Sequence, residues 1–352
     1  MALGPIPNLW SLDFHFLDVG HGDCTIVDIP ERLTVIDINN CKTLGKESTE
    51  ELRRRYTPQQ PNPILAAMYG GAAQALGGPG SLYRALADMA IAEQKLQAAR
   101  DKLTNPIDYL KARFAGRSIF RYIQTHPDMD HMAGIHRLVE DGIGIENLWD
   151  THHCIVKDEV AMLTGEVNHD IQDWHTYLRL RQSAQNPTVL RLTSGSEGNF
   201  WTADEIHVWL PFDNRHCLNP NANPNALSYV LFFRVGKCSI LLGGDATEEM
   251  WEEFYQKYKS GGFPKVNLLK ASHHGRKSGY HREIIKAMNP DVTILSVGEL
   301  KGKDDASASY EKYSVRGCYS TVDHGDIIAK CWNDGDVWLR ERDGDWFLKT
   351  FS

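Results

Sequence analysis

The sequence predicts an α/β protein in which polar, metal-binding side chains stand at the ends of buried strands. Short apolar or alternating runs, typical of β-strands, repeatedly end in Gly-containing turns that are followed by Asp or His. Between residues 82 and 103, apolar side chains recur at three- and four-residue spacing, which predicts an amphipathic helix. A rigid sheet holds side chains at its strand ends in fixed geometry, as a metal or catalytic site requires.

The strands are expected in a regular order along the chain. Asp13–Val19 and Thr25–Ile29 flank a turn at Gly20–Asp23, and Leu33–Ile38 follows as a buried strand. Later strands are expected at Ile119–Ile123, Ile145–Trp149, Ile206–Leu210, Ser228–Val235, Ser239–Leu242, Val266–Leu269, Asp326–Trp332 and Asp336–Arg340. Short helices are expected at Gly134–Glu140 and within Asp158–Asn186.

The region Asn40–Arg117 breaks this strand pattern and contains the amphipathic helix. Its apolar stripe consists of Leu82, Ala85, Leu86, Met89, Ala92, Leu96, Ala99 and Leu103. We expect this stripe to pack on the sheet, and the alternative is a surface for a homodimer or a protein partner over residues 81–103. The chain is thus expected to form a single domain over 1–352, with insertions at about 41–117 (helical) and 155–190.

The segment His126-Pro-Asp128-Met-Asp130-His131 places four potential metal ligands within six residues, directly after a strand-like run. Burying such groups without partners is costly, so a core position is a poor explanation. At a strand end, histidines and carboxylates within a few residues can converge on adjacent metal ions. The alternative is a helix N-cap at Asp128 with solvated neighbours.

Three further segments have the same form of strand, small turn residues and then Asp or His. One runs from Phe16 to Asp23, the second is Gly243-Gly244-Asp245 after an apolar strand, and the third is Lys270–Gly275. They supply Asp18, His21, Asp23, Asp245, His273 and His274. Four such segments in one chain favour a metal site over four ordinary turns.

The order LDVGxGD, HxDxDH, GDA and SHHG resembles that of metallo-β-lactamase-fold hydrolases, and most of all the hydrolase domain of ComEC-type DNA-uptake proteins and their soluble relatives. The resemblance covers roughly residues 12–40 and 119–340. His21 stands where that branch commonly has Gln. Asp128 replaces the second His of the broader HxHxDH pattern, a replacement typical of the ComEC-like branch.

The resemblance implies a four-layer αββα sandwich and two divalent metal ions, zinc or manganese, with magnesium as a further option. It implies that the first metal is held by His126 and Asp128, the second by Asp130, His131 and one of the His273–His274 pair, and that Asp245 bridges both. We favour His274 as the ligand, and His273 then acts on the leaving group or orients its neighbour. The third ligand of the first metal is expected to be Asn225, with His216, His153 and His207 as alternatives; His207 is expected to be packed.

Four residues are candidates for substrate binding, because cationic and hydroxyl groups near the metals can contact phosphate. They are Lys270, Arg276, Lys277 and Ser278, and ordinary solvated charge is the alternative for Arg276 and Lys277. In the resembling family Asp18 lies near the site without binding metal and orients a neighbouring group. Asp23 is expected to do the same, and for both residues a turn-stabilising role is the alternative.

The resemblance favours a metal-dependent hydrolase, a phosphodiesterase or nuclease in which a metal-bridged hydroxide attacks single-stranded DNA or another phosphodiester. Asp130, Asp245 and His273 are its expected catalytic residues. The first alternative is a carbonyl-directed hydrolase acting on a lactone, thioester or β-lactam, since one fold hosts several chemistries. The second is a partner-activated subunit of a multi-protein defence or DNA-processing system.

Composition agrees with a cytoplasmic enzyme. The chain has 352 residues, a formal net charge of −8 and seven cysteines, an odd number that favours reduced thiols. No apolar run approaches the roughly 18 residues that span a bilayer, and the N-terminus lacks the basic and apolar regions of a signal peptide. We therefore expect no membrane association. An acidic chain does not indicate a nucleic-acid binder by itself, although bound metals and a local basic strip can bind phosphate.

Overall fold

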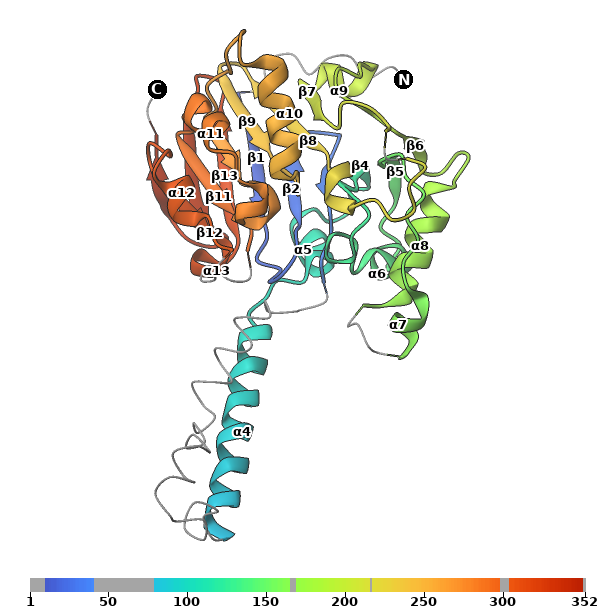
Figure 1. The fold of residues 1–352 in the computed structure, drawn as a ribbon, viewed down its shortest axis with the longest axis vertical. Helices are drawn as coiled ribbons and strands as arrows, with labels where there is room; N and C mark the ends of the chain where they lie inside the picture. The colour runs from blue at the N-terminus through green and yellow to red at the C-terminus, as the bar shows by residue number, and fades with distance from the viewer. Residues whose placement is uncertain (1–9, 41–78, 165–168, 216, 298–303, 351–352) are drawn as a thin grey trace.

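Two β-sheets, packed face to face, make up the centre of the protein (Figure 1). The computed structural model describes residues 10–40, 79–164, 169–215, 217–297 and 304–350. None of the helices in these ranges is both long enough and apolar enough to cross a membrane.

The first sheet has nine strands in the order β15-β14-β13-β1-β2-β3-β4-β5-β6. Strands β3 to β6 run parallel, and the pairs from β15 to β3 are antiparallel. Its strands are β1 (Ser11–Phe16), β2 (Thr25–Asp28), β3 (Thr34–Ile36), β4 (Ile119–Ile123), β5 (Ile145–Trp149), β6 (Thr188–Leu190), β13 (Ile327–Trp332), β14 (Val337–Glu341) and β15 (Trp346–Lys349).

The second sheet has six strands in the order β12-β11-β10-β9-β8-β7. Strands β9 to β12 run parallel, while β7, β8 and β9 form antiparallel pairs. Its strands are β7 (Ile206–Leu210), β8 (Val230–Val235), β9 (Cys238–Leu242), β10 (Leu268–Lys270), β11 (Val292–Leu295) and β12 (Cys318–Ser320). The strands predicted from sequence are confirmed within a few residues, whereas β6, β11, β12 and β15 were not predicted.

Helices cover the outer face of each sheet. Around the first sheet lie α5 (Pro106–Arg113), α6 (Ile135–Glu140), α7 (Glu159–Thr164) and α8 (Ile171–Arg181), whose apolar faces share one buried cluster with β4 and β5. Against the second sheet lie α10 (Glu248–Tyr258), α11 (Arg282–Met288) and α12 (Ser307–Glu311). The remaining helices are α4 (Pro79–Arg100), α9 (Asn199–Ala203), α13 (Thr321–His324) and four short 3₁₀ turns, η1 (Met129–His131), η2 (Pro224–Leu227), η3 (Ser272–Gly275) and η4 (Lys277–Gly279).

A third apolar cluster lies between the sheets. Phe14 of β1 and Trp149 of β5 share it with Phe233 of β8 and Ile294 of β11, and all four are at most 1% exposed. Because each sheet is apolar on both faces, it needs cover on both sides, and the helices supply the outer cover. The predicted four-layer αββα sandwich is therefore confirmed.

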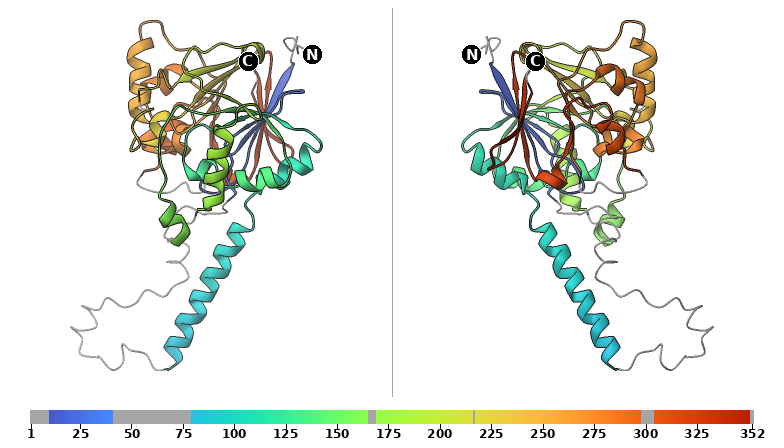
Figure 2. Two further views of the ribbon diagram at one scale, coloured as in Figure 1. Left: turned by 90° about the vertical axis from the view of Figure 1, so that its right-hand side faces the viewer. Right: turned by 90° about the vertical axis from the view of Figure 1, so that its left-hand side faces the viewer.

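The helix α4 differs from the prediction in its packing. It exists, as the apolar spacing predicted, but it extends away from both sheets (Figures 1 and 2). The expectation that its apolar stripe packs on the sheet is therefore wrong. Ala92 and Leu96 of this stripe are buried, and the side chains of Leu82, Ala85, Leu86 and Met89 lie outside the described residues. Periodicity identifies an amphipathic helix, but it carries no information about which surface the apolar face contacts.

Parallel strands of both sheets direct their carboxyl ends toward one edge of the sandwich. In the first sheet, Asp37 follows β3 and His126 follows β4 by three residues; in the second, Asp245 follows β9 and His273 follows β10. Ligand sites in α/β sheets form outside the carboxyl ends of the strands, where the loops diverge. This edge carries the candidate site.

Candidate functional site

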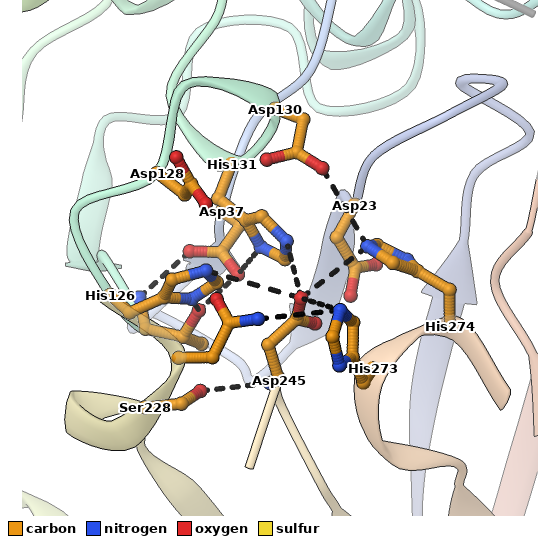
Figure 3. A network of polar contacts seen from close by, with 12 residues as sticks. Asp23, Asp37, His126, Asp128, Asp130, His131, Ser228, Asp245, His273 and His274 are labelled. Carbon is orange, nitrogen blue, oxygen red and sulfur yellow. Dashed lines mark hydrogen bonds and ion pairs between the residues drawn. The ribbon is translucent and has the colours of Figure 1, made fainter. Parts of the chain in front are cut away.

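The carboxylate of Asp245 is the centre of a group of histidines. Its Oδ2 atom lies 3.4 Å from Nε2 of His131, 3.6 Å from that of His274, 3.8 Å from that of His273 and 4.0 Å from that of His126 (Figure 3). These side chains come from both sheets, so the site depends on the packing of one sheet against the other. The backbone of Asp245 is fixed by its N–H, which donates to Oγ of Ser228 at 2.8 Å.

Asp37 orients two of these histidines, His131 directly and His126 through Thr125. Nδ1 of His131 lies 2.7 Å from Oδ2 of Asp37, and the hydroxyl of Thr125 donates to the same oxygen at 2.6 Å. The Thr125 oxygen in turn lies 3.0 Å from Nδ1 of His126, from which it accepts. With both Nδ1 atoms donating, each Nε2 keeps its lone pair, which is the form of imidazole that binds a metal.

His273 and His274 are turned toward the centre by an uncommon backbone. Both have left-handed conformations, with φ of 49° and 56°, and Gly275 follows with φ of 81°. Left-handed non-glycine residues are strained and persist where surrounding contacts enforce them, often at functional sites. Nδ1 of His274 donates to the carbonyl of Ser296 at 3.0 Å, so its Nε2 atom also keeps a lone pair.

The donor set fits divalent metal ions. The Nε2 atoms of His126, His131 and His274 and Oδ1 of Asp245 are buried and have no hydrogen-bond partner among the described residues. Such atoms cost about 1–3 kcal/mol each if nothing binds them. Two atoms bound to one tetrahedral zinc at 2.0–2.2 Å lie roughly 3.4 Å apart, close to the spacings around Asp245. Three groups among the described residues are compact enough to hold an ion: His126 with His131 and Asp245, Asp130 with His131 and His274, and Asp23 with Asp37 and His131.

Burial and neighbouring charges set the protonation states of the same side chains. Burial, followed by the neighbouring His131, lowers the pKa of His126, so that its imidazole is neutral at pH 7. Burial also lowers the pKa of His273. Burial alone would raise the pKa of Asp245, but the imidazoles of His274 and His131 outweigh it and hold that pKa well below its usual range. Burial alone would lower the pKa values of His131 and His274, but the Asp245 carboxylate outweighs burial and raises both, so these two imidazoles tend to hold a second proton while no metal is bound. A divalent metal at Asp245 would displace those protons, so metal binding there is coupled to proton release.

Asp130 forms the open side of the centre. Its Oδ2 atom lies 3.8 Å from Nε2 of His274 and 3.8 Å from Nε2 of His21. His21 in turn contacts the guanidinium of Arg276, with Nη2 3.5 Å from Nδ1. The loop around His21 approaches Asp130 closely, because a Cβ on Gly22 would lie 2.4 Å from the Asp130 carbonyl oxygen. A cation and an imidazole therefore border the site where a ligand would enter.

Asp128 differs from its expected role. Its Oδ1 atom lies 2.7 Å from Nζ of Lys157 and also accepts from the backbone N–H of Met129 at 3.1 Å. None of the three compact donor groups includes Asp128. The resemblance placed it beside His126 on the first metal; in the structure it forms an ion pair with Lys157 and caps the 3₁₀ turn η1, as the N-cap alternative predicted.

Lys270 and Asp23 also differ from their expected roles. Lys270 is 2% exposed and Asp23 is 3% exposed, and the two form a buried ion pair. The expectation that Lys270 contacts substrate is therefore wrong, because burial against Asp23 keeps its ammonium from a ligand. Asp23 pairs with this ammonium instead of loop amides, although its carboxylate lies close to Asp37 and His131. Asp18 contacts none of the four central histidines in any hydrogen bond of the described residues; its N–H donates to Asp326 at 2.7 Å.

The remaining candidates fall into two groups. Ser278, Arg276 and Asn225 lie at the site: Oγ of Ser278 is 2.8 Å from Nδ1 of His273, and Nδ2 of Asn225 is 3.3 Å from its Nε2. Lys277 is exposed on η4. His153 binds the hydroxyl of Tyr177 at 2.7 Å, away from the four histidines, and His207 is exposed on β7 instead of packed. His216 lies outside the described residues.

Asp37, Thr125 and Lys157 were not predicted from sequence. Asp37 directly follows β3, but it lies inside the strand predicted at Leu33–Ile38, so its position at a strand end was not recognised. No local pattern marks Thr125 or Lys157, because each acts through contacts with residues elsewhere at the site.

Neither a protein-family model nor a curated protein matches this chain. Among solved structures, it is similar to the metallo-β-lactamase fold protein YhfI from Bacillus subtilis, with 8% identity and a TM-score of 0.40 over 94% of this chain and 100% of that one. It is similar to unliganded yeast PDE1 at 11% identity and a TM-score of 0.40, covering 88% of this chain and 97% of that one. CmlA, a diiron β-hydroxylase from Streptomyces venezuelae, gives 14% identity and a TM-score of 0.38, covering 89% of this chain and 53% of CmlA. These similarities are too low to transfer an activity, so function is inferred from the residues of this chain.

Proposed function

We propose that this protein is a metal-dependent hydrolase acting on phosphodiesters, with single-stranded DNA as the leading substrate. One observation carries the proposal: four imidazole Nε2 atoms surround Oδ2 of Asp245 at 3.4–4.0 Å. A structural core gains nothing from this arrangement, since three of these nitrogens, those of His126, His131 and His274, are buried without hydrogen bonds. Bound metal ions would satisfy them and offset the cost of burial.

When bound here, zinc or manganese ions would supply a water of lowered pKa and would neutralise charge on the phosphoryl oxygens. The residues of the chain have separate tasks around them. Asp245 and the histidines hold the ions, and Asp37 holds two of those histidines in the metal-binding tautomer. Asp130 provides a further carboxylate on the open side.

The guanidinium that borders the site favours an anionic substrate. The half-buried Arg276 lies beside His21, whereas Lys157 is engaged in its ion pair with Asp128. Arginine binds phosphate oxygens through two parallel N–H donors, which fixes orientation as well as charge. A carbonyl-directed hydrolase would need an apolar pocket at this position, and the named neighbours of the centre are polar or charged.

Hydrolysis of a labelled single-stranded DNA by the purified protein tests this proposal. Mn²⁺, Mg²⁺ and Zn²⁺ are supplied separately, and a chelator-treated sample is the reference. We expect cleavage that requires a metal and is lost in Asp130→Ala. The matched control is His207→Ala, which removes an exposed histidine far along the edge strand and leaves cleavage unchanged.

RNA, a small cyclic phosphodiester and a lactone are assayed in parallel. Preferential hydrolysis of the lactone would transfer the function to the carbonyl-directed class. Bound metal with no hydrolysis of any of these substrates would contradict the proposal.

A further inference from the structure

The first metal position lacks one of its expected ligands. The resemblance assigned this position to His126, Asp128 and Asn225, with Asp245 as the bridge. In the structure, Lys157 occupies Oδ1 of Asp128 at 2.7 Å, and Asp128 retains considerable exposure, with 38% of its side chain accessible. His131 belongs both to the group with His126 and Asp245 and to the group with Asp130 and His274. When it binds the second ion, His126 and Asp245 alone do not complete the first site, because a divalent transition metal takes at least three protein donors in most sites.

His273 supplies a donor at this position. Its Nε2 atom lies 3.8 Å from Oδ2 of Asp245, comparable with the 4.0 Å that separates His126 from the same oxygen. In Figure 3 the His273 ring points toward Asp245, from the same turn after β10 that carries His274. His274 lies 3.6 Å from the same oxygen of Asp245, and its Nε2 atom also lies 3.8 Å from Asp130, a member of the second donor group. The adjacent histidines therefore share Asp245, and Asp130 is a further neighbour of His274.

The tautomer of His273 is suited to metal binding. Oγ of Ser278 lies 2.8 Å from Nδ1 of His273 and can accept its proton. The Nε2 atom then carries a lone pair directed at the centre, as in the other three histidines. The turn that holds this ring requires a glycine at position 279, because a Cβ there would lie 2.7 Å from Cβ of His273.

Asn225 completes the same group. Its amide nitrogen is 3.3 Å from Nε2 of His273, and its Oδ1 atom is buried without a hydrogen-bond partner. A half-turn of the amide exchanges the two atoms and places the oxygen next to His273. A separation of 3.3 Å matches the roughly 3.4 Å between two ligands of one tetrahedral metal ion.

We propose that the first metal ion is held by His126, Asp245, His273 and the amide oxygen of Asn225, while Asp128 serves as the ion-pair partner of Lys157. His273 is then a metal ligand and not an acid for the leaving group. The proposal rests on the metal centre of the proposed function, but it concerns only which side chains bind the ions.

Metal counting on the full chain tests it without any substrate. Each variant is stripped with a chelator, reloaded with Mn²⁺ alone, freed of excess metal and analysed for bound manganese per chain. We expect two ions in the wild type, one in His273→Ala and two in Asp128→Ala. His207→Ala is the matched control with two ions. The electron paramagnetic resonance signal of coupled manganese is expected in the wild type and replaced by that of an isolated ion in His273→Ala.

A second variant protects the test against a folding defect of His273→Ala. Ser278→Ala removes only an exposed hydroxyl, so the fold is retained, and loss of the Nδ1 partner is expected to weaken the first ion about 10-fold, as is typical of such outer contacts. Ser278→Thr keeps the hydroxyl and restores the wild-type affinity.

Three results would overturn the proposal: two ions with the wild-type signal in His273→Ala, loss of one ion in Asp128→Ala, or a single ion in the wild type. Since hydrolysis is not measured, a protein that binds two ions through His273 but cleaves no phosphodiester would support this proposal and contradict only the proposed function.

Discussion

His131 and Asp37 form a buried pair, with Nδ1 of the imidazole 2.7 Å from Oδ2 of the carboxylate. Both residues are at most 1% exposed. The same carboxylate accepts hydrogen bonds from the backbone N–H and the hydroxyl of Thr125 at 2.7 and 2.6 Å, so one aspartate connects the strand ends of β3 and β4 to two imidazoles of the centre. Such carboxylate–histidine pairs orient metal ligands and raise their basicity.

Replacing Asp37 by Asn is therefore expected to weaken metal binding by about 10- to 100-fold. Asparagine suits this position because Asp37 has a left-handed φ of 56°, which Asn tolerates well. Affinity is measured by competition with a chromophoric chelator. Asp28→Asn, on the neighbouring strand, is the control and should bind metal as the wild type does. Equal affinity in both variants would show that Asp37 has no role in orienting the ligands.

The ion pair of Asp23 and Lys270 gives a prediction about stability. Lys270→Met leaves the Asp23 carboxylate buried without its partner, which is expected to cost about 3–5 kcal/mol of unfolding free energy. The double variant Asp23→Asn with Lys270→Met removes both charges and should recover most of that loss. Urea unfolding of the chelator-treated protein measures both values. A double variant as unstable as the single one would indicate that Lys270 contributes by packing and not by charge.

Arg276 is expected to act on anionic substrates. Arg276→Ala removes a charge-assisted contact worth about 1.5–3 kcal/mol, so kcat/KM for a phosphodiester should fall roughly 10- to 100-fold. Lys277→Ala, at the exposed neighbouring position, is expected to change it far less. Steady-state kinetics with an anionic phosphodiester and a neutral ester distinguishes the roles. An equal loss on both substrates would mean that Arg276 supports His21 and does not bind the anion.

Asp18 is expected to make stability depend on pH. Burial, together with the neighbouring Asp326 carboxylate, raises the pKa of Asp18 to about 7, from an ordinary value of 3.8. The folded protein thus binds a proton that the unfolded chain has released between these values, and the unfolding free energy decreases as pH rises from about 4 to 7. In Asp18→Asn this decrease disappears, and the variant is more stable than the wild type at pH 8.

Thermal or urea unfolding of both proteins between pH 4 and 8 checks this prediction, because the difference between them isolates Asp18 from other titrating groups. A difference that stays constant across this range would contradict the raised pKa.

Much of the site follows from local sequence. The dense motif from His126 to His131, together with Asp245 and His274, identified groups that the structure brings together. Each follows a strand that its apolar residues predict without further information. Parallel strands bring their carboxyl ends to one edge of the sheet, so these groups come together there. The sequence does not determine which ring nitrogen each histidine presents to the centre. Asp37, Thr125 and Ser296 set the tautomers, and they lie on other elements.

The wrong predictions concern side chains whose type is compatible with more than one contact. Lys270 had the character of a phosphate ligand, but its strand directs it into the interior, where Asp23 neutralises it. The apolar stripe of α4 predicted a helix, and only the fold shows it projecting from the sandwich (Figure 2). The partner of Lys270 lies far away along the chain, and the periodicity of α4 does not indicate which surface its apolar side chains contact.

The sequence by itself determined the α/β class, most strand positions and the types of residue that can bind metal, because these depend on hydrophobic periodicity and residue chemistry over short distances. The four-layer arrangement was implied by the resemblance of its motifs to a known family. Only the tertiary structure decided which side chains meet. A left-handed turn directs both His273 and His274 toward Asp245, and an ion pair holds Asp128 against Lys157. Those contacts form when two sheets pack, and their energies depend on distances that no local pattern encodes.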